Sequence, residues 1–146
     1  MSLFSVLSIS ASGMAAQRSR AEVISENLAN ADTTRTPDGG PYRRRDVVLQ
    51  SQATSSPFAG MLAEQMGSGG SGVSVSDVLV DESEPLRRYS PGHPDADKDG
   101  YVAMPRINPT EEMVDLMGAS RGYQANVAAF SAAKDMIHRS IDLLKA

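Results

Sequence analysis

The sequence predicts an α+β protein in which long helices at the two ends of the chain form an antiparallel coiled-coil domain, with a small β-rich middle segment of hairpin-like strands and loops. The first observation is the position of the helix-breaking residues. All eight prolines lie between Pro37 and Pro109, and nine of the twelve glycines lie between Gly39 and Gly100. The second observation is a three-four repeat of apolar residues at both ends, and the third is apolar-polar alternation in the middle.

We therefore divide the chain into an N-terminal helix at residues 1–32, a β/loop segment at residues 33–108 and a C-terminal helix at residues 109–146. The N-terminal helix has a narrow apolar stripe, which polar residues such as Ser10 and Gln17 interrupt. A narrow stripe buries little area, so this helix needs packing partners to be stable. Its apolar positions are Leu7, Met14, Ala21, Ile24 and Leu28.

The beginning of the chain does not have the pattern of a cleaved export signal. A signal peptide carries basic residues before its apolar part, whereas the first basic residues here, Arg18 and Arg20, follow it. No apolar run approaches the length of about eighteen residues that a membrane span needs. We expect neither signal cleavage nor membrane insertion.

The middle segment is predicted to contain three strands, at residues 42–50, 72–81 and 101–104. Apolar and β-branched residues alternate with polar residues in these stretches. Residues 55–72 end in a Gly/Ser-rich stretch that is typical of a flexible linker, and we assign no strand to them.

The C-terminal helix has the clearest pattern in the chain. Asn108 is suited to be the N-cap and Pro109 the first helical residue, while Glu111 stands three residues after the cap as in a capping box. We expect a helix over residues 109–145. Ten of the sixteen residues from position 118 to 133 are Gly, Ala or Ser, which allow helices to approach closely. The seam, at steps of three and four, includes Leu116, Tyr123, Val127, Phe130, Ile137, Ile141 and Leu144.

Two interpretations of these seams stay open. In the first, the two terminal helices form an ordinary helical hairpin core. In the second, helices from other copies of the chain complete the packing, because two helices alone cannot bury both of their faces. Under the second interpretation, the seam residues of both helices belong to a subunit interface.

The acidic stretch from Asp95 to Gly100 resembles the start of an EF-hand calcium loop, with carboxylates at the first, third and fifth positions and glycine at the sixth. An EF-hand needs a Glu at the twelfth position, where this chain has Arg106, and Pro94 and Pro105 prevent helices from flanking the loop. We interpret the stretch as a solvated turn and expect no metal site. A soluble calcium-responsive binding module is the alternative function.

Composition and charge exclude several classes of function. A net charge of −4 gives no electrostatic footprint for nucleic acid, and the absence of cysteine excludes disulfides, thiolate metal sites and a cysteine nucleophile. The two histidines, His93 and His138, lie far apart in sequence, and no nucleophile motif accompanies them. We therefore expect no enzymatic activity and no cofactor.

Three stretches of the sequence resemble the flagellar basal-body rod proteins. They are SENLANADTTRTPDGGPYRRR, PGHPDADKDGYV and NPTEEMVDLMGASRGYQANVAAFSAAKDM. The part NLANADTT resembles the wider family of axial rod and hook proteins, whereas TPDGGPYRR and HPDADKDGY resemble the proximal rod proteins within it. The signature residues are Asn27, Leu28, Ala29, Asn30, Thr33, Gly39, Gly40, Pro41, Tyr42, His93, Pro94, Asp95, Asp97, Gly100 and Tyr101.

The resemblance implies a structural subunit of the proximal rod, which polymerises helically to form the drive shaft and export channel for motility. Its partners would be other copies of itself, proximal and distal rod subunits and the rod-base adaptor. The resemblance also implies export through the flagellar type III apparatus without signal cleavage, followed by assembly in the periplasm. It leaves open whether the rod lies close to peptidoglycan and whether residues 43–45 touch the cell wall.

Overall fold

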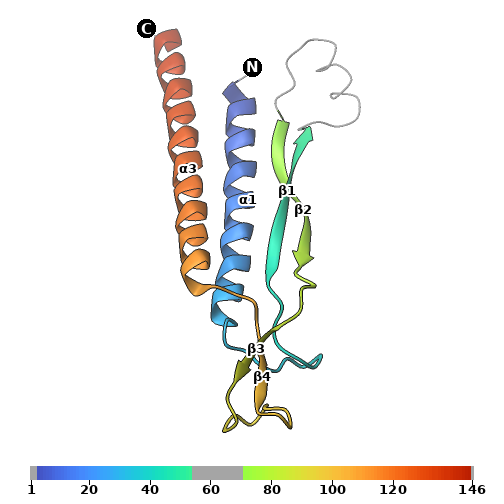
Figure 1. The fold of residues 1–146 in the computed structure, drawn as a ribbon. Helices are drawn as coiled ribbons and strands as arrows, with labels where there is room; N and C mark the ends of the chain where they lie inside the picture. The colour runs from blue at the N-terminus through green and yellow to red at the C-terminus, as the bar shows by residue number, and fades with distance from the viewer. Residues whose placement is uncertain (1–2, 54–70, 146) are drawn as a thin grey trace.

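The computed structural model describes residues 3–53 and 71–145, and its elements confirm the predicted α+β fold (Figure 1). Two long helices, α1 (Leu3–Ala29) and α3 (Pro109–Lys145), lie side by side and run antiparallel. Asn108 caps α3 as expected, because its Oδ1 accepts a hydrogen bond from the Thr110 N–H at 3.1 Å. None of the described helices is long and apolar enough to cross a bilayer.

The strands form two separate antiparallel hairpins. The β1–β2 ribbon, built from β1 (Arg45–Ala53) and β2 (Ser71–Val80), runs along the side of α1 that faces away from α3 (Figure 1). The shorter hairpin of β3 (Leu86–Tyr89) and β4 (Tyr101–Met104) lies beyond the lower ends of the two helices. Helix α1 therefore has a neighbour on each side, which explains why no single broad apolar stripe marks it.

The three predicted strands are present, with β1 ending at Ala53 rather than at residue 50 and β2 shifted by one residue at each end. Two further differences have a clear physical reason. β1 begins at Arg45 rather than at Tyr42. The Tyr42 N–H donates to the Thr33 carbonyl at 3.0 Å, and this hydrogen bond holds Tyr42 in the preceding turn. β3 was not predicted, since its four residues include two arginines and show no alternation; its pairing with β4 makes it a strand. Most of the unassigned stretch 55–72 lies outside the described residues.

Small and polar residues form the contact between α1 and α3. On α3 these residues, the contact row, are Glu112, Ala119, Gly122, Asn126 and Ala133, all buried or half-buried. A Cβ added to Gly13 would lie 2.6 Å from the Asn126 Oδ1, and one added to Gly122 would lie 3.0 Å from the Gln17 Cδ. The helices are thus close enough that a Cβ at either glycine would press against a side chain of the other helix.

Part of the seam predicted from large apolar residues lies beside the contact row, whereas Leu116, Phe130 and Ile137 are half-buried. Met113, Tyr123 and Val127 each follow a contact-row residue by one position and are exposed. One step along a helix turns the side chain by about 100°, so the large residues flank the contact. The physical reason is that small residues let the two backbones approach, whereas large residues in the same row would hold them apart.

The core of the single chain is thin. Among the described residues, the buried hydrophobic side chains are Ala16, Ile24, Val102, Ala119 and Ala133. Helix α3 has 37 residues and α1 has 27, so α3 is longer by about 15 Å at 1.5 Å per residue. Its C-terminal end reaches past the start of α1 (Figure 1). Residues near that end, such as Leu143, are therefore exposed.

Candidate subunit interface and its supporting junction

A buried polar cluster fixes the β1–β2 ribbon and the two helices relative to one another. This polar junction consists of Asn27 on α1, Glu112 on α3, and Tyr42, Arg44 and Arg45 at the start of β1. Asn27 is 0% exposed and Glu112 is 1% exposed. Buried polar groups are tolerated only when they are hydrogen-bonded, and each of these two side chains has several partners.

Asn27 takes the place of a neighbouring strand at the outer edge of β1. Its Nδ2 donates to the Arg45 carbonyl at 2.8 Å, and its Oδ1 accepts from the Arg45 N–H at 2.9 Å. The Tyr42 hydroxyl donates to the same Oδ1 at 3.1 Å, while Nδ2 also reaches the Glu112 Oε2 at 3.2 Å. A carboxamide offers both a donor and an acceptor, so an aspartate or a leucine here would leave strand groups unsatisfied.

Glu112 is the buried anion of the junction, and Arg44 is its counterion. The Arg44 Nε donates to the Glu112 Oε1 at 2.6 Å, and the side-chain exposures are 30% and 2%. This hydrogen bond is the main cause that raises the pKa of the Arg44 guanidinium, so Arg44 keeps its positive charge. Burial raises the pKa of the Tyr42 hydroxyl, which favours the protonated form that donates to Asn27.

The acidic turn joins β3 to β4, and protein donors satisfy its carboxylates. The Asp97 Oδ1 accepts from the N–H groups of Asp99 and Tyr101, and the Oδ2 pairs with the Arg87 Nη2 at 2.7 Å. These contacts, led by the bond from the Tyr101 N–H, lower the pKa of Asp97. The Thr34 hydroxyl donates to the Asp95 Oδ2 at 2.8 Å. Within the described residues no group of three or more His, Asp or Glu side chains is placed to hold a metal ion.

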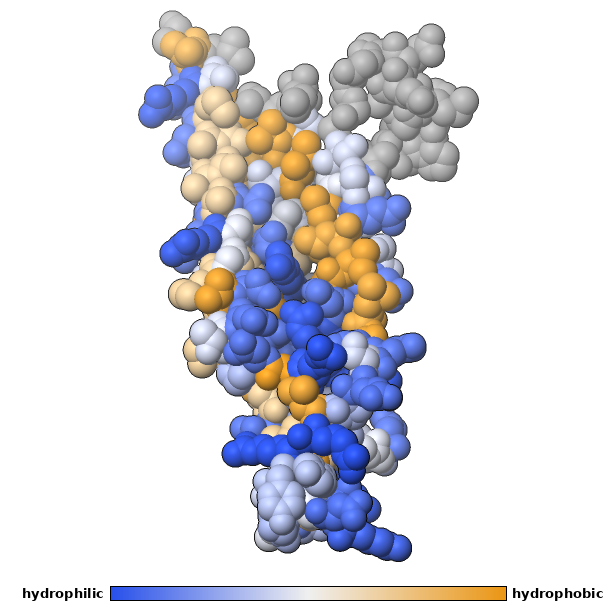
Figure 2. Space-filling view, viewed as in Figure 1, coloured by the Kyte–Doolittle hydropathy of each residue, from blue (hydrophilic) through white to orange (hydrophobic). Residues whose placement is uncertain are grey.

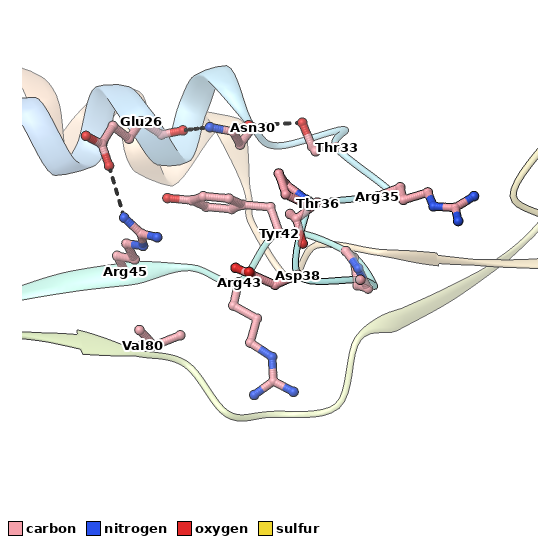
Figure 3. A pocket seen from close by; sticks show the side chains of 13 residues that line it. Glu26, Asn30, Thr33, Arg35, Thr36, Asp38, Tyr42, Arg43, Arg45 and Val80 are labelled. Carbon is pink, nitrogen blue, oxygen red and sulfur yellow. Dashed lines mark hydrogen bonds and ion pairs between the residues drawn. The ribbon is translucent and has the colours of Figure 1, made fainter.

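Signature residues of the turn after α1 shape a pocket of about 570 Å³ (Figure 3). The turn is closed by a hydrogen bond from the Thr36 N–H to the Gly40 carbonyl at 2.8 Å, and Gly39 and Gly40 have φ values of 85° and 80°. The guanidinium groups of Arg35 and Arg43 point in different directions (Figure 3). Signature residues lining the pocket are Asn30, Thr33, Gly39, Pro41 and Tyr42.

The remaining signature residues lie at the end of α1 or in the β3–β4 turn. The His93 Nδ1 accepts the Asp95 N–H at 3.1 Å. Gly100 has a φ of 79°, and a Cβ there would lie 3.0 Å from the Tyr89 ring. Leu28 is half-buried, whereas Ala29 and Pro94 are exposed.

The predicted interface residues differ in their exposure within one chain. Ile24 is buried, and Tyr123, Val127 and Ile141 are exposed by 41%, 40% and 42%. We call these three exposed residues, together with Met113, the outer flank of α3. The side chain of Leu144 lies outside the described part of the chain. The half-buried residues are Leu7, Met14, Ala21, Leu28, Leu116, Phe130 and Ile137.

Sequence reasoning did not find Arg44 and Glu112 as partners. The sequence places the three consecutive arginines in the predicted strand at residues 42–50, and it indicates a role at the start of the helix for Glu111 rather than for Glu112. The position of Glu112 in the sequence could have indicated its burial. It precedes Met113 by one residue and lies on the helix face that contains Ala119. A carboxylate that shares a helix face with small buried residues needs a cation nearby.

Comparison with known proteins agrees with the family resemblance. The family described as "Flagella basal body rod protein" matches residues 7–35, and the family described as "Flagellar basal body rod FlgEFG protein C-terminal" matches residues 98–143. The flagellar basal-body rod protein FlgC of Bacillus subtilis is 43% identical, over 99% of this chain and 100% of its own length. The FlgC proteins of Borreliella burgdorferi and Escherichia coli O6:H1 are 40% and 39% identical, with coverage of 99% and 98% of both chains. The chain therefore belongs to the FlgC family of flagellar basal-body rod proteins.

Proposed function

We propose that the chain is a structural subunit of the proximal rod in the flagellar basal body. It polymerises with further copies and with other proximal and distal rod proteins and the rod-base adaptor, and the assembly forms the drive shaft and export channel. The observation that carries this proposal is the outer flank of α3, where Tyr123, Val127 and Ile141 remain 40–42% exposed although they continue a heptad repeat. A regular row of large apolar residues beside a completed intrachain contact marks a second helix–helix contact.

The form of α3 supports the same role. The small residues of its contact row are used by α1, so the outer flank is free to pack against a helix of a neighbouring subunit. The C-terminal end of α3 extends past the start of α1 (Figure 1), and Ile141 and Leu143 near that end are exposed. Assembly through this flank would bury residues that a monomer leaves in water, and it requires no catalytic activity.

We further propose that the chain is exported unfolded through the flagellar type III apparatus, without signal cleavage, and assembles in the periplasm close to peptidoglycan. The thin core supports this route, because a chain that buries mostly alanine between its helices is easily kept unfolded. Of the three consecutive arginines, Arg44 pairs with Glu112 and Arg45 with Glu26. Arg43 is exposed, and we assign any contact with the cell wall to it.

The test of this role is to place a charge on the outer flank without disturbing the single chain. Val127→Glu changes an exposed residue, so the free energy of unfolding of the monomer should change by no more than about 0.5 kcal/mol. Ala128→Glu is the matched control, because Ala128 is the next residue, is also exposed and points about 100° away from the flank.

In bacteria that carry Val127→Glu, we expect exported protein but no complete rods in electron micrographs of purified basal bodies, and no swimming. Ala128→Glu should leave swimming largely intact. Complete rods with Val127→Glu, at normal protein level, would contradict assembly through the outer flank.

A further inference from the structure

The outer edge of β2 is open near its C-terminal end. The Asp81 N–H bonds to the Arg44 carbonyl at 2.8 Å, and Arg45 stands opposite Val80 in the ribbon. Hydrogen-bonded and non-hydrogen-bonded pairs alternate in an antiparallel ladder, so the backbone groups of Val78 and Val80 point away from β1. Arg45 and Val80 form a non-hydrogen-bonded pair. On the β1 side of this pair, the Arg45 N–H and C=O point outward and are hydrogen-bonded to Asn27. On the β2 side, no strand from the described residues 3–53 and 71–145 lies beside this edge.

This open edge is apolar in the middle and acidic at both ends. Val78, Leu79 and Val80 are 40%, 54% and 47% exposed, and Asp77 and Asp81 stand on either side of them. A hydrophobic strip runs along the ribbon in the space-filling view (Figure 2). Soluble proteins usually interrupt such an edge with lysine or proline, and neither occurs in β2.

In the single chain, the Asp77 side chain occupies one hydrogen-bond donor of the β2 edge. Its own Oδ1 accepts the Val78 N–H at 2.8 Å, so one of the outward donors is satisfied without a partner strand. When a cation approaches the exposed Asp77 carboxylate, the carboxylate can pair with the cation instead of with the Val78 N–H. The Val78 N–H is then available for a hydrogen bond to a partner strand. The edge is therefore protected in the monomer and opened by a basic partner.

The chain carries a strand edge that complements this one. The Ser90 N–H bonds to the Gly100 carbonyl at 2.8 Å, so by the same alternation the backbone groups of Arg87 and Tyr89 point away from β4. Strand β3 reads Leu-Arg-Arg-Tyr, and all four residues are exposed. Within the described part of the chain, no strand lies beside its outer edge. Of the two basic residues on β3, Arg87 pairs with Asp97 at 2.7 Å, so Arg88 is the cation that can meet the two acidic residues bordering the edge of β2.

We propose that the β2 edge of one copy pairs antiparallel with the β3 edge of a second copy, which deepens the assembly role proposed above and rests on it. In the register that aligns the outward groups, Val78 faces Tyr89 and Val80 faces Arg87, so the exposed Tyr89 ring covers Val78. Arg88 then lies opposite Leu79 and diagonal to both Asp77 and Asp81, within reach of a long side chain. Different edges of the two copies meet, so the contact is heterologous and adds subunits in one direction.

Charge reversal tests the pairing. Asp77→Arg and Arg88→Asp should each weaken self-association of the purified full-length chain about tenfold in analytical ultracentrifugation, because each places like charges across the edge. The double variant restores the attraction between positions 77 and 88 but leaves the carboxylate introduced at position 88 beside Asp81, so its association should be weakened much less than the product of the two single effects. Glu82→Arg, an exposed residue outside β2, is the control for net charge and should have no effect. A double variant as weak as the product of the singles would overturn the proposal.

A disulfide tests the register in assembled rods. The chain has no cysteine, so Leu79→Cys combined with Arg88→Cys introduces the only two thiols. Under mild oxidation of isolated basal bodies, this pair should give covalent dimers and larger multimers, whereas each single variant and the pair Leu79→Cys with Lys98→Cys should not. Absence of multimers from rods that support swimming would overturn the edge pairing and leave the proposed rod function standing. Loss of rods on Val127→Glu tests that function separately.

Discussion

Replacement of Arg44 with alanine should destabilise the chain far more than the same change at the adjacent Arg43. Arg44 is the cation beside Glu112, whose side chain is 2% exposed, whereas Arg43 is an exposed residue. Removing one partner of a buried ion pair costs about 3–5 kcal/mol, because the remaining charge is buried without compensation. The Arg44 side chain is itself 30% exposed, so water reaches part of the vacated space and the expected cost is about 2–3 kcal/mol. Arg43→Ala should cost no more than about 0.5 kcal/mol.

The assay is urea unfolding of the purified full-length chain, followed by circular dichroism at the helix band. With Glu112→Ala as the second single variant, the double variant Arg44→Ala/Glu112→Ala completes a double-mutant cycle. It should be clearly more stable than the sum of the two single changes predicts, since no uncompensated charge remains. If Arg44→Ala and Arg43→Ala unfold at the same urea concentration, the polar junction does not stabilise the fold and the assignment of Glu112 as its buried anion is wrong.

Two further predictions concern the helix contact and the junction. Gly13→Ala should lower the free energy of unfolding by about 1–2 kcal/mol, because the added Cβ would lie 2.6 Å from the Asn126 Oδ1. Gly118→Ala is the control; its Cβ would meet nothing within 4 Å, so it should raise the free energy of unfolding by up to about 1 kcal/mol. Equal urea midpoints for the two variants would contradict the close approach of the helices. Burial raises the pKa of Tyr42 above its ordinary 10.0, so its contribution is fully present below pH 10 and lost as pH rises through the folded-state pKa. Tyr42→Phe should reduce this alkaline loss in unfolding measured between pH 8 and about pH 11, and an unchanged alkaline slope would contradict it.

The long helices could be predicted because local signals agree with one another. Asn108 and Pro109 mark the start of α3, and the concentration of prolines and glycines in the middle leaves both ends free to be helical. The alternation in β2 likewise reports a strand with two different faces. These are properties of neighbouring residues, so one sequence is enough to find them.

The details of packing could not be predicted in the same way. A seam of large residues is the usual sign of a helix contact, yet Gly13 and Gly122 allow a closer contact that excludes Tyr123 and Val127 from it. The polar junction joins Asn27 to Glu112 across 85 positions in sequence, and no local pattern links them. β3 is a strand because β4 pairs with it, so its own four residues carried too little signal.

The most direct test of the central proposal is a cryo-electron microscopy map of the rod from basal bodies of the bacterium that makes this chain. The proposed role requires several copies of the chain in the rod, with a helix of a neighbouring subunit packed on Tyr123, Val127 and Ile141 of each copy, while α1 keeps the contact row. A map in which these three side chains face open space, or in which the chain is absent from the rod, would contradict assembly through the outer flank of α3.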